Sequence, residues 1–205
     1  MKTLTVAVIL AFIALVFASI TWGGVDDPRQ RASSDGRSDA GVLHAARQVV
    51  AAFKAQDGKK LASLVHPKKG VRFSSSAYVD VASDVVLSSA QIKSFWTDKR
   101  TYTWGFADGT GDPIKLTPSQ YCRKYILSRD FLNPSSINVN SDHAAGNTSN
   151  NAALAYPSGT RVEYYIEPSI RDNRPELDWA ALRLVFEKTG DSWYLIAVIH
   201  DEWTT

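Results

Sequence analysis

The residues best placed for chemistry lie near the end of the chain, in the run His200-Asp201-Glu202. On the strand predicted over residues 192–203, His200 shares one face with Glu202, while Asp201 lies on the other face. Four apolar residues precede Asp201 on its face, so we expect Asp201 at the rim of a pocket. His200 or Asp201 could act there as a general acid or base. Solvation of the strand end and a specific ligand contact are the alternatives.

Two arginines, Arg72 and Arg183, each lie between apolar residues of a predicted strand. Such an arginine can be a surface cross-strand partner, or it can hold an anionic ligand with its planar fork. Six Trp and eight Tyr either fill the core or stack on a carbohydrate or apolar ligand. The weak catalytic candidates are His200 and Asp201, and the ligand-binding candidates are Arg72, Tyr78, Trp104, Arg183, His200 and Trp203.

No metal or cofactor is expected. None of the four histidines has another histidine three or four residues away, as a sequence-local zinc motif requires. Residues 108–112 resemble part of a calcium loop but lack its later glutamate, so a turn is the better interpretation. Nucleophile-elbow, phosphate-loop and dinucleotide motifs are missing. Cys122 is interpreted as a buried apolar residue, with a nucleophile helped by Arg123 and Lys124 as the alternative.

Composition excludes several classes of protein. The 205 residues carry a net charge of +2, which argues against broad electrostatic binding to nucleic acid. With 44% apolar residues the chain has an ordinary globular composition. Its single cysteine cannot form an internal disulfide framework.

The first 40 residues predict an export signal or membrane anchor, followed by a linker. Residues 4–20 carry no charge after Lys2, which indicates either a cleaved signal peptide ending at Ala18 or a retained membrane anchor over 1–20. Residues 21–40 are polar and without period, so we interpret them as a flexible linker. The protein is therefore expected outside the cytoplasm, secreted or anchored by its N-terminal helix, and touching the membrane only through that segment.

One domain is predicted over residues 41–205. A helix is expected from near Ala40 to the break at 56–58, followed by a short helix up to His66. A capping box at Ser88, and Thr117 as a helix cap followed by Pro118, predict two later helices, the second reaching about residue 129. Residues 133–151 are interpreted as a loop or weak strand, and long strands are expected over 160–166, 179–187 and 192–203. Helices followed by such strands predict an α+β fold, with the helices on one face of a curved, mostly antiparallel sheet.

The order of these elements resembles the nuclear-transport-factor-2-like superfamily. The resemblance rests on a helix ending in Asp57-Gly58, the short helix 60–65, the pair His66-Pro67 and the final hairpin 182–196. It implies a cone, in which a strongly bent sheet wraps around helices and leaves a pocket at the open end. A homodimer formed through the sheet is a further implication.

A narrower resemblance is to an exported bacterial domain of unknown function that is often found on lipoproteins. The blocks that carry it are 66–74, 102–105, 108–111, 146–148, 162–165, 178–179 and 199–204. The chain departs from those proteins because it has no lipidated cysteine near its start. The function expected is a non-catalytic module at the cell envelope that binds a small molecule or an envelope protein. The alternatives are a structural role in an envelope complex and a small acid–base enzyme of the isomerase, dehydratase or cyclase type, which some cone-fold members are.

Overall fold

The computed structural model describes residues 28–143 and 148–203, with side chains from Asp39 onward. The predicted export segment 1–20 and residues 21–27 of the predicted linker lie outside the described residues. The helices are α1 (Pro28–Lys54), α2 (Gly58–Leu64), α3 (Ser89–Lys93), α4 (Pro118–Tyr121), the π-helical turn η1 (Cys122–Ile126) and α5 (Ala152–Ala155). The strands are β1 (Val71–Ser74), β2 (Val85–Leu87), β3 (Tyr102–Phe106), β4 (Pro113–Leu116), β5 (Ser136–Val139), β6 (Thr160–Ile166), β7 (Ile170–Arg171), β8 (Arg174–Pro175), β9 (Ala180–Thr189) and β10 (Ser192–Glu202).

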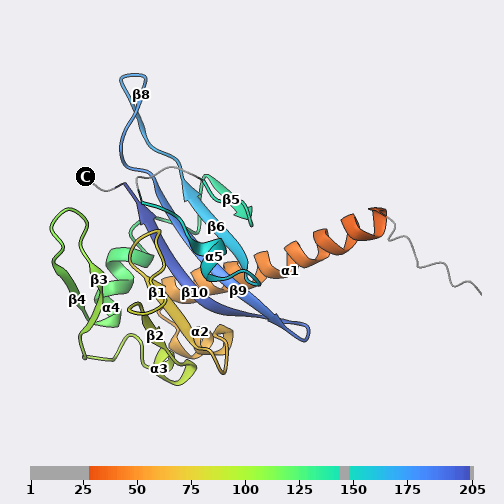
Figure 1. Ribbon diagram of the computed structural model, residues 1–205, viewed down its shortest axis with the longest axis horizontal. Coiled ribbons are helices and arrows are strands. Elements are labelled where there is room, and N and C mark those ends of the chain that lie inside the picture. The colour runs from red at the N-terminus through yellow and green to blue at the C-terminus, as the bar shows by residue number, and fades with distance from the viewer. Residues whose placement is uncertain (1–27, 144–147, 204–205) are drawn as a thin grey trace, which may run out of the picture.

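Six strands form one mixed sheet in the order β2-β1-β10-β9-β6-β5. β1 runs parallel to β10, and the other pairs in this sheet are antiparallel. The long β9–β10 hairpin lies in the middle, while β3–β4 and β7–β8 form two separate hairpins (Figure 1). The predicted α+β class, with a large and mostly antiparallel sheet, is confirmed.

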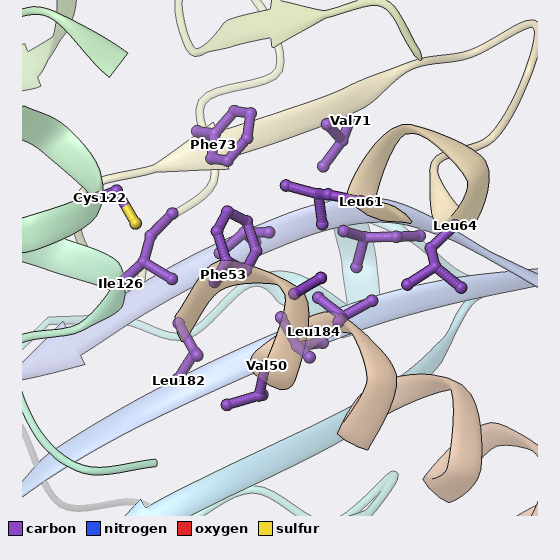
Figure 2. Close-up of a cluster of buried hydrophobic side chains, with 14 of the residues drawn as sticks. Val50, Phe53, Leu61, Leu64, Val71, Phe73, Cys122, Ile126, Leu182 and Leu184 are labelled. Carbon is purple, nitrogen blue, oxygen red and sulfur yellow. The ribbon is translucent and has the colours of Figure 1, made fainter. Parts of the chain in front are cut away.

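The main core lies between α1 and one face of the sheet. Every second residue of β9 faces this core, so Leu182, Leu184 and Phe186 are fully buried, as their alternation predicts. Figure 2 shows Phe53 of α1 lying between side chains of β1 and β9. Burying a phenyl ring of this kind contributes about 2–3 kcal/mol. A second, smaller cluster on the opposite face of the sheet includes Ala152 of α5.

The first helix is longer than the sequence predicts. It begins at Pro28 rather than near Ala40, so residues 28–40 are helical where a flexible linker is expected. Proline suits the first turn of a helix, because its fixed φ is helical and no intrahelical bond is lost there. The N-terminal part of α1 extends beyond the sheet (Figure 1). Among the described residues, no helix is both long enough and apolar enough to cross a membrane.

Turn and capping residues act where the sequence places them. Gln56 takes a positive φ of 54° after α1, and Asp57 then caps α2 by accepting from the Lys60 N–H at 2.9 Å. Ser88 forms the predicted capping box at α3, and the predicted cap Thr117 forms a capping box at α4. The strand that carries Arg72 is the short β1, and the weak strand within 133–151 is β5.

The helix predicted from Thr117 to about residue 129 is wrong in its second half. The α-helix ends at Tyr121 and continues as the π-helical turn η1. In this arrangement Tyr121 and Tyr125 stack with centroids 5.0 Å apart, and both are buried. Such turns are rare and frequently occur at functional sites.

Because of a β-bulge, the residues that share a face of β10 differ from those that simple alternation predicts. The register shifts between Leu195 and Ala197, so these two residues do not share a face as simple alternation predicts. Leu195 packs in the main core with Val198, whereas Ala197 joins the cluster on the opposite face. Beyond the bulge, alternation holds up to His200, which contacts Tyr125 on the main-core side.

Candidate functional site

A cleft of about 510 Å³ lies where β10 ends, beside η1 and the β3–β4 hairpin. Three of the predicted candidates, His200, Asp201 and Trp203, line it. The other lining residues are Ser75, Ser76, Phe106, Ala107, Asp108, Ile114, Lys124, Tyr125, Thr148 and Glu202. The end of one strand therefore brings together the histidine and acids that the sequence singled out.

His200 is the most unusual residue of this cleft. It is only 2% exposed, and its ring meets the ring of Tyr125 edge to face with centroids 5.3 Å apart. Within the described residues, neither ring nitrogen makes a hydrogen bond of good geometry. Nε2 lies 3.3 Å from Oε1 of Glu202, a distance that permits an ion pair when the ring is protonated, although the two groups are not aligned for a hydrogen bond. A buried polar group without a partner costs about 1–3 kcal/mol, so this arrangement calls for an explanation.

The two acids beside His200 have pKa values shifted in opposite directions. Burial raises the pKa of Asp201, and the Arg183 guanidinium acts against that shift. The interaction with His200 lowers the pKa of Glu202, with burial opposing it. Asp201 Oδ2 accepts from Arg183 Nη1 at 2.8 Å, whereas Oδ1 accepts no hydrogen bond from the described residues.

Arg183 does not line the cleft but contacts Asp201, which does. It is fully buried, so it is neither the surface partner nor the anion clamp that the sequence suggested. Its cross-strand neighbour is Glu163, to which Nε donates at 2.8 Å. Glu163 in turn accepts from the backbone N–H of His143 at 3.0 Å and lies 2.6 Å from Nδ1 of that residue. A cation shared by two buried carboxylates has little capacity left for an external anion.

The remaining candidates lie away from the cleft. Arg72 donates through Nε to Tyr156 Oη at 3.1 Å and lines a separate hollow of about 330 Å³. Tyr78 is 52% exposed on the segment after β1. Trp104 has no exposed surface and donates its indole N–H to the Leu116 carbonyl at 2.8 Å.

Trp104 is nevertheless connected to the cleft by a series of contacts between aromatic rings. Its ring stacks on Tyr121 with centroids 4.1 Å apart and an interplanar angle of 17°. Tyr121 stacks on Tyr125, which meets His200, so a column of aromatic rings runs from the core to the floor of the cleft. Sequence reasoning did not name Tyr125, although the four-residue spacing of the two tyrosines places them on one side of a helix.

Two other expectations can be compared with the structure. Burial raises the pKa of the Cys122 thiol to about 12, and the thiol is 1% exposed, which fits the interpretation as a buried apolar residue and not as a nucleophile. The segment 108–112 connects β3 to β4, with positive φ values at Gly109 and Gly111. Within residues 28–143 and 148–203, no group of three or more His, Cys, Asp or Glu residues could hold a metal ion.

Comparison with known proteins gives distant likenesses alone. No family model matches the chain, and no curated protein does. Among solved structures, an NTF2 design is similar at 13% identity with a TM-score of 0.36, covering 80% of this chain and 98% of its own. A calcium/calmodulin-dependent protein kinase II association domain from Xanthomonas campestris is similar at 12% identity with the same TM-score, covering 81% of this chain and 86% of its own.

Proposed function

We propose that this protein is a binding module, and that the cleft at the end of β10 holds a small ligand. The observation that carries the proposal is His200, a buried imidazole at the cleft whose Nδ1 has no hydrogen-bond partner in the described part of the chain and whose Nε2 only approaches Glu202, at 3.3 Å. A bound ligand that supplies the missing partner would offset the cost of burying this group. The volume of about 510 Å³ is within the range usual for small-molecule sites.

The residues that line the cleft indicate which chemical groups such a ligand would carry. Phe106, Tyr125 and Trp203 offer aromatic surface, and Ser75 and Ser76 add hydroxyl groups to the lining. A ligand with an apolar ring and a few hydrogen-bonding groups would match both parts. Phe106 is 64% exposed, so its ring is available to an apolar ligand.

Fold family and location are parts of the same proposal. The order of helices and strands resembles that of the nuclear-transport-factor-2-like cone, and this resemblance implies a pocket at the open end. The hydrophobic segment 1–20 and the polar residues after it support export, with the domain secreted or held at the cell envelope. If the cleft binds no small molecule, an envelope protein or a second copy of the chain becomes the partner to seek.

A second candidate function is acid–base catalysis in the same cleft. His200 Nε2 lies 3.3 Å from a Glu202 carboxylate oxygen, which is the kind of pair that orients an imidazole to move a proton. Binding and catalysis differ in one respect that can be measured. A catalyst converts its ligand, and Glu202→Gln would stop the conversion while leaving the apolar contacts of the cleft in place.

A thermal-shift screen tests the proposed function. The full-length chain, in mild detergent, is screened against sugars, cell-wall fragments, lipids and small aromatic compounds. A true ligand raises the melting temperature with concentration, because it binds the folded state alone. The shift must disappear in His200→Leu and persist in His44→Leu, whose exposed imidazole lies on α1 outside the cleft. Mass spectrometry of each bound compound then shows whether it is converted. A shift that persists in His200→Leu would contradict the proposed site.

A further inference from the structure

We propose that the ligand of this cleft is a cationic amine, whose ammonium group binds between the ring of Tyr125 and the carboxylate of Glu202. This inference rests on the proposed function of the cleft and specifies its ligand. It is drawn from an ammonium group that the chain already places there, from the balance of donors and acceptors, and from the aromatic wall.

Lys124 is the ammonium already present. Its Nζ lies 5.2 Å from the centroid of the Tyr125 ring, within the distance at which a cation is attracted to an aromatic face. Its charge also acts on Glu202, whose pKa it helps to lower. Lys124 is an exposed residue on a flexible stem, so it can swing away at little cost. The space between the Tyr125 ring and the Glu202 carboxylate therefore suits an ammonium group, and this group need not be that of Lys124.

Three acids, Asp108, Asp201 and Glu202, line the cleft together with one lysine, Lys124. Oδ1 of Asp201 accepts no hydrogen bond from the described residues, and Oε1 of Glu202 lies 3.3 Å from His200 Nε2. Arg183 cannot neutralise Asp201 fully, because it also pairs with Glu163 at 2.8 Å. An ammonium group brings three donors and a positive charge, whereas an anion would face these carboxylates.

Part of the wall is apolar and is formed by Phe106, Ala107, Ile114 and Trp203. Phe106 is largely exposed, and Trp203 closes the end of β10 beside Asp201. An amine with an aromatic or cyclic body would cover these rings while its charged end reaches Glu202. The chemical class is therefore an arylalkyl or cyclic amine rather than a small inorganic cation, for which the described residues offer no ligand cluster.

Three probes of nearly equal shape test this charge preference: benzylamine, benzyl alcohol and benzoate. They are titrated at pH 7 into the full-length chain in detergent, and binding is followed by NMR. Benzylamine is expected to bind at least about fivefold more tightly than benzyl alcohol, with benzoate weakest, since one cation–aromatic contact and one charged hydrogen bond supply about 1 kcal/mol or more. The advantage must shrink as salt is raised.

Variants locate the ammonium site. Glu202→Gln is expected to weaken benzylamine about tenfold and benzyl alcohol hardly at all. Lys124→Met should strengthen benzylamine about threefold, because the competing ammonium is removed. Glu176→Gln is the matched control: this exposed carboxylate pairs with Arg171 on the β7–β8 hairpin and should change nothing. Weaker amine binding in Lys124→Met would overturn the inference, because this exposed side chain is dispensable for folding.

The outcomes separate the two proposals. If neutral or acidic compounds bind in a manner that requires His200 and the amine has no advantage, the cleft is a binding site but the inferred ligand class is wrong. If neither the amines nor any compound of the wider screen binds, both proposals fail together.

Discussion

The guanidinium of Arg183 and the carboxylate of Asp201 lie 2.8 Å apart on neighbouring strands, both within the buried part of the protein. Arg183 reaches Glu163 on β6 at the same distance, so one cation holds two buried carboxylates across three adjacent strands. Asp201 also lines the cleft. Arg183 therefore holds Asp201 in position, although Arg183 itself does not line the cleft.

Breaking this pair should be strongly destabilising. Arg183→Met keeps the length of the side chain but removes its charge, which leaves Asp201 buried without this partner and Glu163 with His143 alone. We expect a loss of about 3–5 kcal/mol in the free energy of unfolding, measured by urea denaturation at pH 7. Arg171→Met is the control, because the Arg171 side chain is exposed, and it should change stability by less than about 0.5 kcal/mol. Equal stability of the two variants would show that the buried carboxylates tolerate the loss.

Asp84 should make the fold less stable as pH rises. Burial raises its pKa to about 6 in the folded protein, although Ser74 and the Asp80 backbone N–H both bond to the carboxylate. The protonated form therefore stabilises the fold fully below the unfolded pKa of 3.8, and this contribution is lost as pH rises through about 6. Asp84→Asn stays neutral and keeps an acceptor oxygen. Its stability relative to the wild type should rise by about 1–2 kcal/mol between pH 4 and pH 7.5, a figure reduced for solvent screening.

Asp80 provides a control of opposite sign for that experiment. The hydroxyl of Ser83 lowers the pKa of this exposed carboxylate, and the backbone of Ala82 adds to the effect. Asp80→Asn should therefore lose stability relative to the wild type as pH rises through the acidic range. Urea denaturation at a series of pH values measures both variants. Parallel pH profiles for Asp84→Asn and the wild type would contradict the raised pKa.

Replacing His200 by an apolar residue should stabilise the protein while it removes ligand binding. His200→Leu has a similar volume and leaves no unpartnered nitrogen in the buried space. We expect a gain of about 1 kcal/mol in the free energy of unfolding, because the desolvation cost disappears. His200→Ala removes the same nitrogens but leaves a cavity, so it should be less stable than His200→Leu. A wild-type protein more stable than His200→Leu would indicate that the imidazole has a partner, such as an ordered water.

Local signals predicted much of the fold. Capping residues such as Ser88 and Thr117 act over three positions, and the alternation along β9 indicates which side chains face the main core. The bulge near Leu195 and the π-helical turn η1 were not foreseen, because each is decided by tertiary packing rather than by neighbouring residues. The early start of α1 at Pro28 was missed because polar residues without period resemble a linker.

The candidate site was predicted in part for the same reason. His200, Asp201 and Trp203 are consecutive or nearly so, and a strand end keeps them together. Tyr125 and Lys124 come from η1, about 75 residues earlier, and only the folded chain brings them beside β10. The role of Arg183 was misjudged because a sequence cannot show that Glu163 lies directly opposite it. Long-range pairing of this kind decides whether a charged residue is exposed or buried.

The lone cysteine should be unreactive in the folded protein. Burial raises the pKa of the Cys122 thiol to about 12, so very little thiolate exists at pH 8. Labelling with Ellman's reagent should be slow in buffer and complete in urea. A cysteine introduced at the exposed position of Ser63, in a Cys122→Ala background, should react within seconds under both conditions. Fast native labelling of Cys122 would mean that the segment around η1 opens readily.

Gly105 should be required by the backbone at the edge of the cleft. Its φ is +133°, and a Cβ there would come within 2.6 Å of Ser75 Oγ. Gly105→Ala is expected to lower the free energy of unfolding by about 1–3 kcal/mol, through the strained backbone and the clash together. The double variant with Ser75→Ala relieves the clash alone, so it should recover part of this loss in a double-mutant cycle measured by urea denaturation.

A matched glycine separates the two causes. Gly111 has a φ of +71°, and a Cβ there meets nothing within 4 Å, so Gly111→Ala should cost about 1 kcal/mol or less. A larger cost for Gly105→Ala that the Ser75 change does not reduce would place the whole effect in the backbone. Equal costs at both glycines would show that the β3–β4 hairpin adjusts freely, and that the cleft wall next to Phe106 is more pliable than its packing suggests.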